Sequence, residues 1–199
     1  MAHEKKLADR LARWDPAAPY AGEAWPGVAR DLAAAGDGPL LPDRRPRDPW
    51  KPRYFLDTEF TDFDACQLIS MAIVGENGRE FYGECSDFEH PLCSDFVRAT
   101  VLPQLGQFPD RAMPFNQLRR ELLDWLNRVP AKPTPVLCFD FHGDLQLVEH
   151  LLGGPLPRGW KTENICNRLD ARRVAGYFAE HGGEHHALYD ARAHGSAFI

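Results

Sequence analysis

The chain has 199 residues, a net charge of −6 and 44% hydrophobic residues. These values are typical of one globular domain of ordinary size with an extension. The acidic balance excludes a protein that coats nucleic acid through overall positive charge. It leaves open an enzyme that meets a polyanion at one metal-loaded site, because bound divalent cations reverse the local charge.

The cysteines and the apolar segments indicate in which cellular compartment the protein is expected. There are five cysteines and no Cys-x-x-Cys motif, which argues against a zinc ribbon and against a secreted disulfide framework. The sequence has no signal-peptide pattern at its start and no apolar run of membrane-spanning length. We therefore expect reduced thiols, a cytoplasmic location and no membrane partner.

Residues 1–48 differ in composition from the rest. Leu7, Leu11 and Trp14 have helical spacing, and the segment after Asp15 is rich in Pro, Ala, Gly and Arg. We expect an N-terminal extension over 1–48 that is partly irregular, followed by the main domain over 49–199.

Three strands are expected at the start of the main domain. Residues 53–60 and 67–74 are apolar runs of strand length, and residues 80–85 form a third. Asn77-Gly78, between the second and third, is a typical hairpin turn. The three strands are therefore predicted to form an antiparallel meander.

The remainder alternates between helices and strands. Helices are expected at 94–105, at 115–129, in the segment that ends at Gly153, after Asp170 as the N-cap, and over 187–199; strands are expected at 134–140 and 164–167. This order predicts an α/β fold with a mixed five-stranded sheet flanked by helices.

The first strand carries a pair of carboxylates near its end. Asp57 and Glu59 are two residues apart, so in a strand they share one face. Adjacent carboxylates repel each other unless a cation lies between them or one of them is protonated. Oxygen ligands favour hard cations, so the pair suggests Mg²⁺ or Mn²⁺.

Further acidic groups and a histidine occur later in the chain. Asp144 lies at the start of a predicted helix, and His185 lies in a loop five residues before Asp190, one turn inside the last helix. Two metal ions held by such carboxylates can clamp the attacking and leaving oxygens of a phosphodiester, and a histidine can take the proton from the attacking water.

These motifs resemble those of the 3′→5′ exonucleases of the DEDD superfamily, histidine subtype, which includes oligoribonuclease and ribonuclease T. Residues 53–60 followed by 67–70 are most similar to its small actinobacterial and phage exoribonuclease-like group, and the resemblance covers residues 53–199. It implies a ribonuclease H-like fold and a homodimer as one possible assembly. It further implies two Mg²⁺ or Mn²⁺ ions on Asp57, Glu59, Asp144 and Asp190, His185 as general base, and contacts from Thr58 and Phe60 to the terminal nucleotide.

Two assignments have alternatives. Asp140, at the end of a predicted strand, competes with Asp144 as the middle ligand; we prefer Asp144 because the buried face of a helix follows it. Relatives often carry an aromatic residue directly before this Asp, whereas Gly143 stands here. The alternative for Phe60 is a core residue, which is the commoner role of a lone Phe at a strand end.

The function expected from these residues is removal of nucleoside 5′-monophosphates from single-stranded 3′ ends. RNA is the favoured substrate and DNA is the alternative, since the motifs do not reveal 2′-hydroxyl recognition. A non-catalytic binding module with the same fold is the second hypothesis. The presence of all the candidate site residues argues against it.

Overall fold

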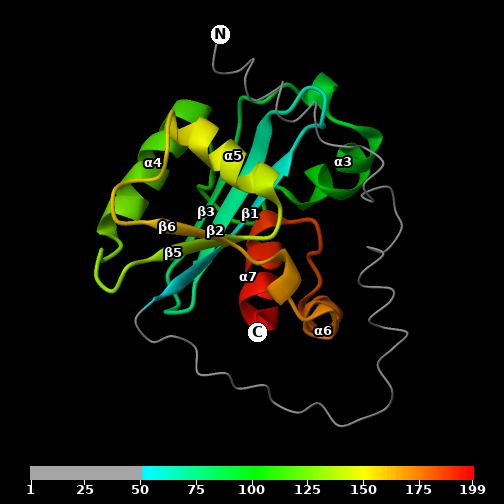
Figure 1. Ribbon diagram of the computed structural model, residues 1–199. Helices are drawn as coiled ribbons and strands as arrows, with labels where there is room; N and C mark the ends of the chain where they lie inside the picture. Colours follow the sequence, from blue (N-terminus) through cyan, green and yellow to red (C-terminus); the bar gives the residue numbers. More distant parts are fainter. Residues whose placement is uncertain (1–50) are drawn as a thin grey trace.

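A six-stranded mixed sheet organises the part of the chain that the structure describes, residues 51–199 of a computed structural model (Figure 1). The strand order is β4-β3-β2-β1-β5-β6. The strands are β1 (Arg53–Phe60), β2 (Leu68–Gly75), β3 (Glu80–Cys85), β4 (Ala112–Met113), β5 (Val136–Phe139) and β6 (Lys161–Asn164). The helices are α3 (Asp95–Thr100), α4 (Phe115–Arg128), α5 (His142–Leu152), α6 (Ala171–His181) and α7 (Ala187–Ala197), with short 3-10 turns η1 (His90–Leu92), η2 (Leu102–Gln104) and η3 (Cys166–Arg168).

The α/β fold and the antiparallel meander are confirmed. β1 pairs antiparallel with β2, β2 pairs antiparallel with β3, and β1 and β5 are parallel. The arrangement is consistent with a ribonuclease H-like fold. The helix predicted from Leu7 to Trp14 and the extension over 1–48 lie outside the described residues.

The structure differs from the sequence-based expectation at two edge strands. The two-residue β4 adds a sixth strand beside β3, and two residues are too few to show a periodic pattern. β6 lies at 161–164 rather than 164–167 because it is a polar edge strand whose side chains are largely exposed. An apolar pattern therefore points to the wrong residues there.

The helix predicted over 94–105 is also shorter than expected. Ser94 caps α3 by accepting a hydrogen bond from the backbone N–H of Val97, and the α-helix ends at Thr100. The 3-10 turn η2 follows and contains Pro103, which has no backbone N–H to continue an α-helix. The capping role predicted for Asp170 is confirmed, since its carboxylate accepts from two backbone N–H groups at the start of α6.

The helices cover both faces of the sheet (Figure 1). α4 and α5 pack on one face, where Leu118, Leu122 and Leu151 join Tyr54 and Leu56 of β1 in the main core. α6 and α7 lie on the other face. Among residues 51–199 no helix has the length and apolar character needed to cross a membrane.

Small side chains bring α7 close to the sheet. Ala187 and Ala191 are fully buried against Ala72 of β2 and Tyr82 of β3. A Cβ placed on Gly195 would lie only 3.1 Å from the ring of Phe55 on β1. The close approach matters for function because α7 carries Asp190.

Ala191→Leu should displace α7 from the sheet. Added methylene groups in a packed core cost about 1–3 kcal/mol, so we expect the free energy of unfolding in urea to fall by that amount. Ser196→Leu introduces the same side chain at an exposed position of α7 and should change it by less than about 0.5 kcal/mol. Equal effects of the two substitutions would contradict the close packing of α7.

Candidate metal-binding active site

A cavity of about 490 Å³ lies at the end of β1. Its wall includes every site residue predicted from the sequence: Asp57, Thr58, Glu59, Phe60, Asp144, His185 and Asp190. Asp140 and His194 also line it. The fold therefore brings together residues from β1, α5, α7 and the loop before α7. The most distant of them, on β1 and α7, are more than 130 positions apart in the sequence.

Asp57, Glu59 and Asp190 form the first acidic group. One carboxylate oxygen of each lies within 4.8 Å of one oxygen of each other residue. Asp57 and Glu59 project from the same face of β1, as their spacing predicts, and this is the face that α7 covers. Asp190, near the start of α7, is thereby placed beside them.

The start of α7 is held in place by His186. Its imidazole Nδ1 accepts a hydrogen bond from the backbone N–H of Leu188 and so caps the helix. Its own backbone N–H donates to Oδ2 of Asp190 at 2.8 Å, and its Nε2 lies 3.1 Å from the hydroxyl of Tyr82. His186 therefore fixes the helix start through its imidazole and one oxygen of the Asp190 carboxylate through its backbone N–H.

Asp144 reaches the cavity from the opposite face of β1. The hydroxyl of Thr58 donates to its Oδ1 at 2.6 Å, and the carboxyl group is buried. Thr58 alternates with Asp57 and Glu59, so it points toward α5 rather than α7. Asp144 belongs to neither of the two three-residue groups close enough to share a cation among residues 51–199, although its charge acts on both Asp57 and Glu59.

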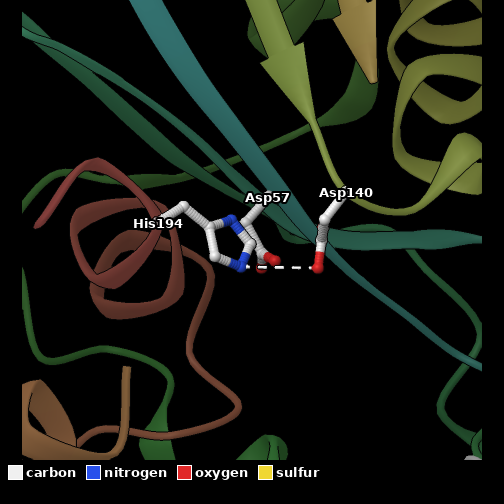
Figure 2. A group of neighbouring side chains, drawn as sticks. All are labelled: Asp57, Asp140 and His194. Atoms are coloured by element: carbon white, nitrogen blue, oxygen red, sulfur yellow. Dashed lines mark ion pairs between the residues drawn. The ribbon is translucent and has the colours of Figure 1, made fainter. Parts of the chain in front are cut away.

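Asp140, Asp57 and His194 form the second group, again with ligand atoms within 4.8 Å of one another (Figure 2). Asp140 directly follows β5, which runs parallel to β1 with Phe55 opposite Cys138. Continuing this register by two residues places Asp140 level with Asp57 and on the same face. This register explains why Asp140, the alternative to Asp144 as the middle metal ligand, lies beside Asp57.

His194 was missed by the sequence analysis. It follows Asp190 by four residues on α7, so the two side chains share one helix face. That spacing was the available signal. Its imidazole is buried and lies 3.5 Å from Asp140, measured from Nε2 to Oδ2.

His185 borders the cavity from the loop before α7. Its backbone has φ of 63°, a left-handed conformation that is rare for residues with a Cβ and is often found at functional sites. The side chain of Gln104 donates to the carbonyl oxygens of Glu184 and His185. The His185 ring contacts the ring of Phe96 edge to face, with centroids 5.0 Å apart. His185 is part of neither acidic group.

The position of Phe60 is compatible with both of the roles considered for it. It lines the cavity and also packs against the main core. Its ring contacts Phe63 and Phe141, with centroids 5.1 Å and 6.3 Å away. The three rings give the cavity an apolar part of its wall beside the carboxylates.

The carboxylates destabilise one another's charged forms. Burial raises the pKa of Asp57 well above its usual range, and the charges of Asp190 and Asp144 raise it further. Burial and the same two charges raise the pKa of Glu59. Burial raises the pKa of Asp190 to about 8, although backbone N–H groups of His186 and His185 act in the opposite direction.

These carboxylates fit a divalent cation. No lysine or arginine of the described part of the chain lines the cavity, so protein cations do not neutralise the crowded negative charge. Carboxylate oxygens are the ligands that Mg²⁺ and Mn²⁺ prefer. A bound divalent cation would remove the repulsion that raises these pKa values.

Comparison with known proteins gives partial matches. No protein-family model matches the chain. Two curated proteins of Mycobacterium tuberculosis, from strains CDC 1551 / Oshkosh and ATCC 25618 / H37Rv, are each 44% identical to it over 54 residues. Both are described as 3′-5′ exoribonucleases, and the match covers 27% of this chain and 32% of each relative. The chain therefore spans about a third of their length, and the similarity supports a relationship to exonucleases.

The metal-free protein should become less stable as pH rises. The pKa of Asp190 is about 8 in the folded protein, whereas the pKa of an Asp in an unfolded chain is about 3.9. Between these values the folded protein holds a proton that the unfolded chain has lost, so the free energy of unfolding falls with increasing pH. Asp57, Glu59 and Asp144 act in the same direction, because their pKa values are also raised.

Urea unfolding in EDTA at a series of pH values from 5 to 8.5 tests this expectation. Asp190→Asn should flatten the dependence, and its stability relative to wild type should rise toward pH 8. Asp124→Asn, at an exposed position of α4, is the control and should retain the wild-type slope. A wild-type stability that rises across this range would refute the expected protonation of the cluster.

Proposed function

We propose that this protein is a metal-dependent 3′→5′ exoribonuclease that hydrolyses single-stranded RNA ends to nucleoside 5′-monophosphates. The main support is the convergence of Asp57, Glu59 and Asp190 within 4.8 Å in a cavity without lysine or arginine among the described residues. The description of the two mycobacterial relatives as exoribonucleases supports the choice of reaction and of RNA. The nuclease domain is proposed to span residues 49–199, with 1–48 as an extension.

The proposed roles follow from the positions of the side chains. Asp57, Glu59, Asp144 and Asp190 would hold two Mg²⁺ or Mn²⁺ ions, with Thr58 orienting Asp144 through its hydroxyl. Bound divalent cations supply charge stabilisation for the in-line displacement at phosphorus. The His186 N–H fixes one oxygen of Asp190 and leaves the other free to act as a ligand.

His185 is proposed as the general base. It lines the cavity outside both acidic groups, so its imidazole can accept a proton from the attacking water without serving as a ligand. The Gln104 hydrogen bonds and the Phe96 ring hold the loop and the imidazole in position. Placement of the base in advance avoids the entropy cost of ordering it during the reaction.

The cavity suits one terminal nucleotide. Its volume of about 490 Å³ is in the range of small-molecule sites. Phe60 and Thr58 are proposed to contact that nucleotide, with the Phe60 ring offering a stacking surface. The net charge of −6 disfavours extended binding to a duplex, since such binding depends on many phosphate contacts.

Asp190→Asn should abolish most of the hydrolysis while the fold is retained. Loss of one carboxylate ligand removes charge stabilisation worth several kcal/mol, so the rate should fall on the order of 100- to 1000-fold. The assay is shortening of 5′-labelled single-stranded RNA with Mn²⁺ or Mg²⁺, and with EDTA as the metal-free control. Asp124→Asn should keep the wild-type rate; an Asp190→Asn enzyme as active as this control would exclude the metal assignment.

The same assay with 5′-labelled DNA separates the two substrate classes. A ladder that shortens from the 3′ end with RNA, and much more slowly with DNA, is expected. Preferential degradation of DNA would change the proposed substrate to DNA.

His185→Ala should lower the rate without releasing metal. General-base catalysis contributes about 10²- to 10⁴-fold, so the hydrolysis rate should fall within that range. Mn²⁺ affinity, measured by isothermal titration calorimetry, should stay at the wild-type value. Loss of Mn²⁺ binding would instead make His185 a metal ligand.

A further inference from the structure

His194 is a buried polar side chain that the proposed reaction does not use. It is only 8% exposed, and its Nδ1 makes no hydrogen bond within residues 51–199. A buried ring nitrogen without a hydrogen-bond partner is energetically unfavourable. The imidazole points from α7 toward Asp57 and Asp140, and its other nitrogen, Nε2, is the one that faces Asp140 (Figure 2).

The contact between His194 and Asp140 is too long for a strong ion pair. Their Nε2 and Oδ2 atoms are 3.5 Å apart, whereas charge-assisted N–H···O bonds are about 2.7–2.9 Å. Two ligands on one tetrahedral cation, each bonded at about 2.0–2.2 Å, lie roughly 3.4 Å apart. The observed separation therefore matches a pair of metal ligands.

Asp57 completes a set of three. Its carboxylate oxygen and the ligand atoms of Asp140 and His194 are mutually within 4.8 Å. The three residues come from β1, the end of β5 and α7, which the sheet register and the close packing of α7 bring together. The set is thus part of the rigid framework of the domain and does not depend on an exposed loop.

We propose that Asp57, Asp140 and His194 form a site for a first-row transition-metal ion, such as Zn²⁺ or Co²⁺, that discriminates against Mg²⁺. The nitrogen ligand carries the selectivity, because imidazole suits transition-metal ions while all-oxygen sites suit Mg²⁺. The neighbouring group of Asp57, Glu59 and Asp190 offers only oxygen. Asp57 is thereby shared between two positions of different chemistry.

The proposed site of Asp57, Asp140 and His194 rests on the proposed function only in that both use Asp57 as a metal ligand. Metal binding at His194 requires neither RNA nor hydrolysis, so the two proposals can fail separately. Hydrolysis with Mg²⁺ alone, without any selective Co²⁺ binding, would remove the His194 site and leave the nuclease proposal in place. Selective Co²⁺ binding without hydrolysis would do the reverse.

Co²⁺ titration of the full chain in excess Mg²⁺ tests the site. The visible absorption of Co²⁺ reports its ligands, and wild-type protein should show a saturable signal that Zn²⁺ displaces. His194→Asn and Asp140→Asn should each weaken Co²⁺ binding on the order of 100-fold. Glu59→Gln, which alters only the all-oxygen group, should retain the Co²⁺ signal.

His181→Asn is the matched control. His181 lies at the end of α6 with its side chain 44% exposed and outside the cavity wall, so its substitution should leave Co²⁺ affinity unchanged. Circular dichroism of each variant verifies folding. Should His194→Asn fail to fold, Asp140→Asn decides between the outcomes.

Three results would overturn the proposal. The first is a Co²⁺ signal that excess Mg²⁺ abolishes in wild-type protein, which requires no variant. The second is unchanged Co²⁺ affinity in folded His194→Asn or Asp140→Asn protein. The third is a thiolate charge-transfer band in the near ultraviolet, which would place the ion on one of the five cysteines instead.

Discussion

Repulsion among crowded carboxylates at the end of β1 is the interaction on which this domain depends. Asp57, Glu59, Asp144 and Asp190 surround one cavity, and each has a raised pKa with burial as the largest cause. A domain selected for stability alone would place apolar side chains there, since buried charge without a partner is costly. The arrangement is understandable if cations enter the cavity and turn mutual repulsion into shared attraction.

The fold supplies this crowding through three simple geometric rules. Alternation along β1 places Asp57 and Glu59 on the α7 face and Thr58 on the α5 face. Parallel pairing of β1 with β5 sets Asp140 level with Asp57. Small residues on α7 allow that helix to lie close enough for Asp190 and His194 to reach the strand ends.

Local patterns in the sequence were sufficient for part of this picture. The apolar runs of β1 and β2, together with the Asn77-Gly78 turn, predicted the meander, and the spacing of Asp57 and Glu59 predicted their shared face. The edge strands β4 and β6 could not be predicted, because one has two residues and the other is polar. Neither provides the apolar alternation on which a local prediction relies.

The candidate site, like the fold, could be predicted only in part from the sequence. The cavity includes every residue named from the motifs. The contact between Asp140 and His194 was not predicted. That contact depends on the register between β1 and β5 and on the distance of α7 from the sheet. Both are tertiary properties, which a one-dimensional pattern does not contain.

Gln104 connects η2 to the loop that carries His185. Its amide joins η2 to the loop before α7 through two carbonyl oxygens, while Phe96 of α3 touches the His185 ring and is 52% exposed at the cavity wall. A ligand that displaces Phe96 would therefore also act on the loop that carries the His185 imidazole. We expect occupancy of the cavity and the position of this imidazole to be coupled in this way.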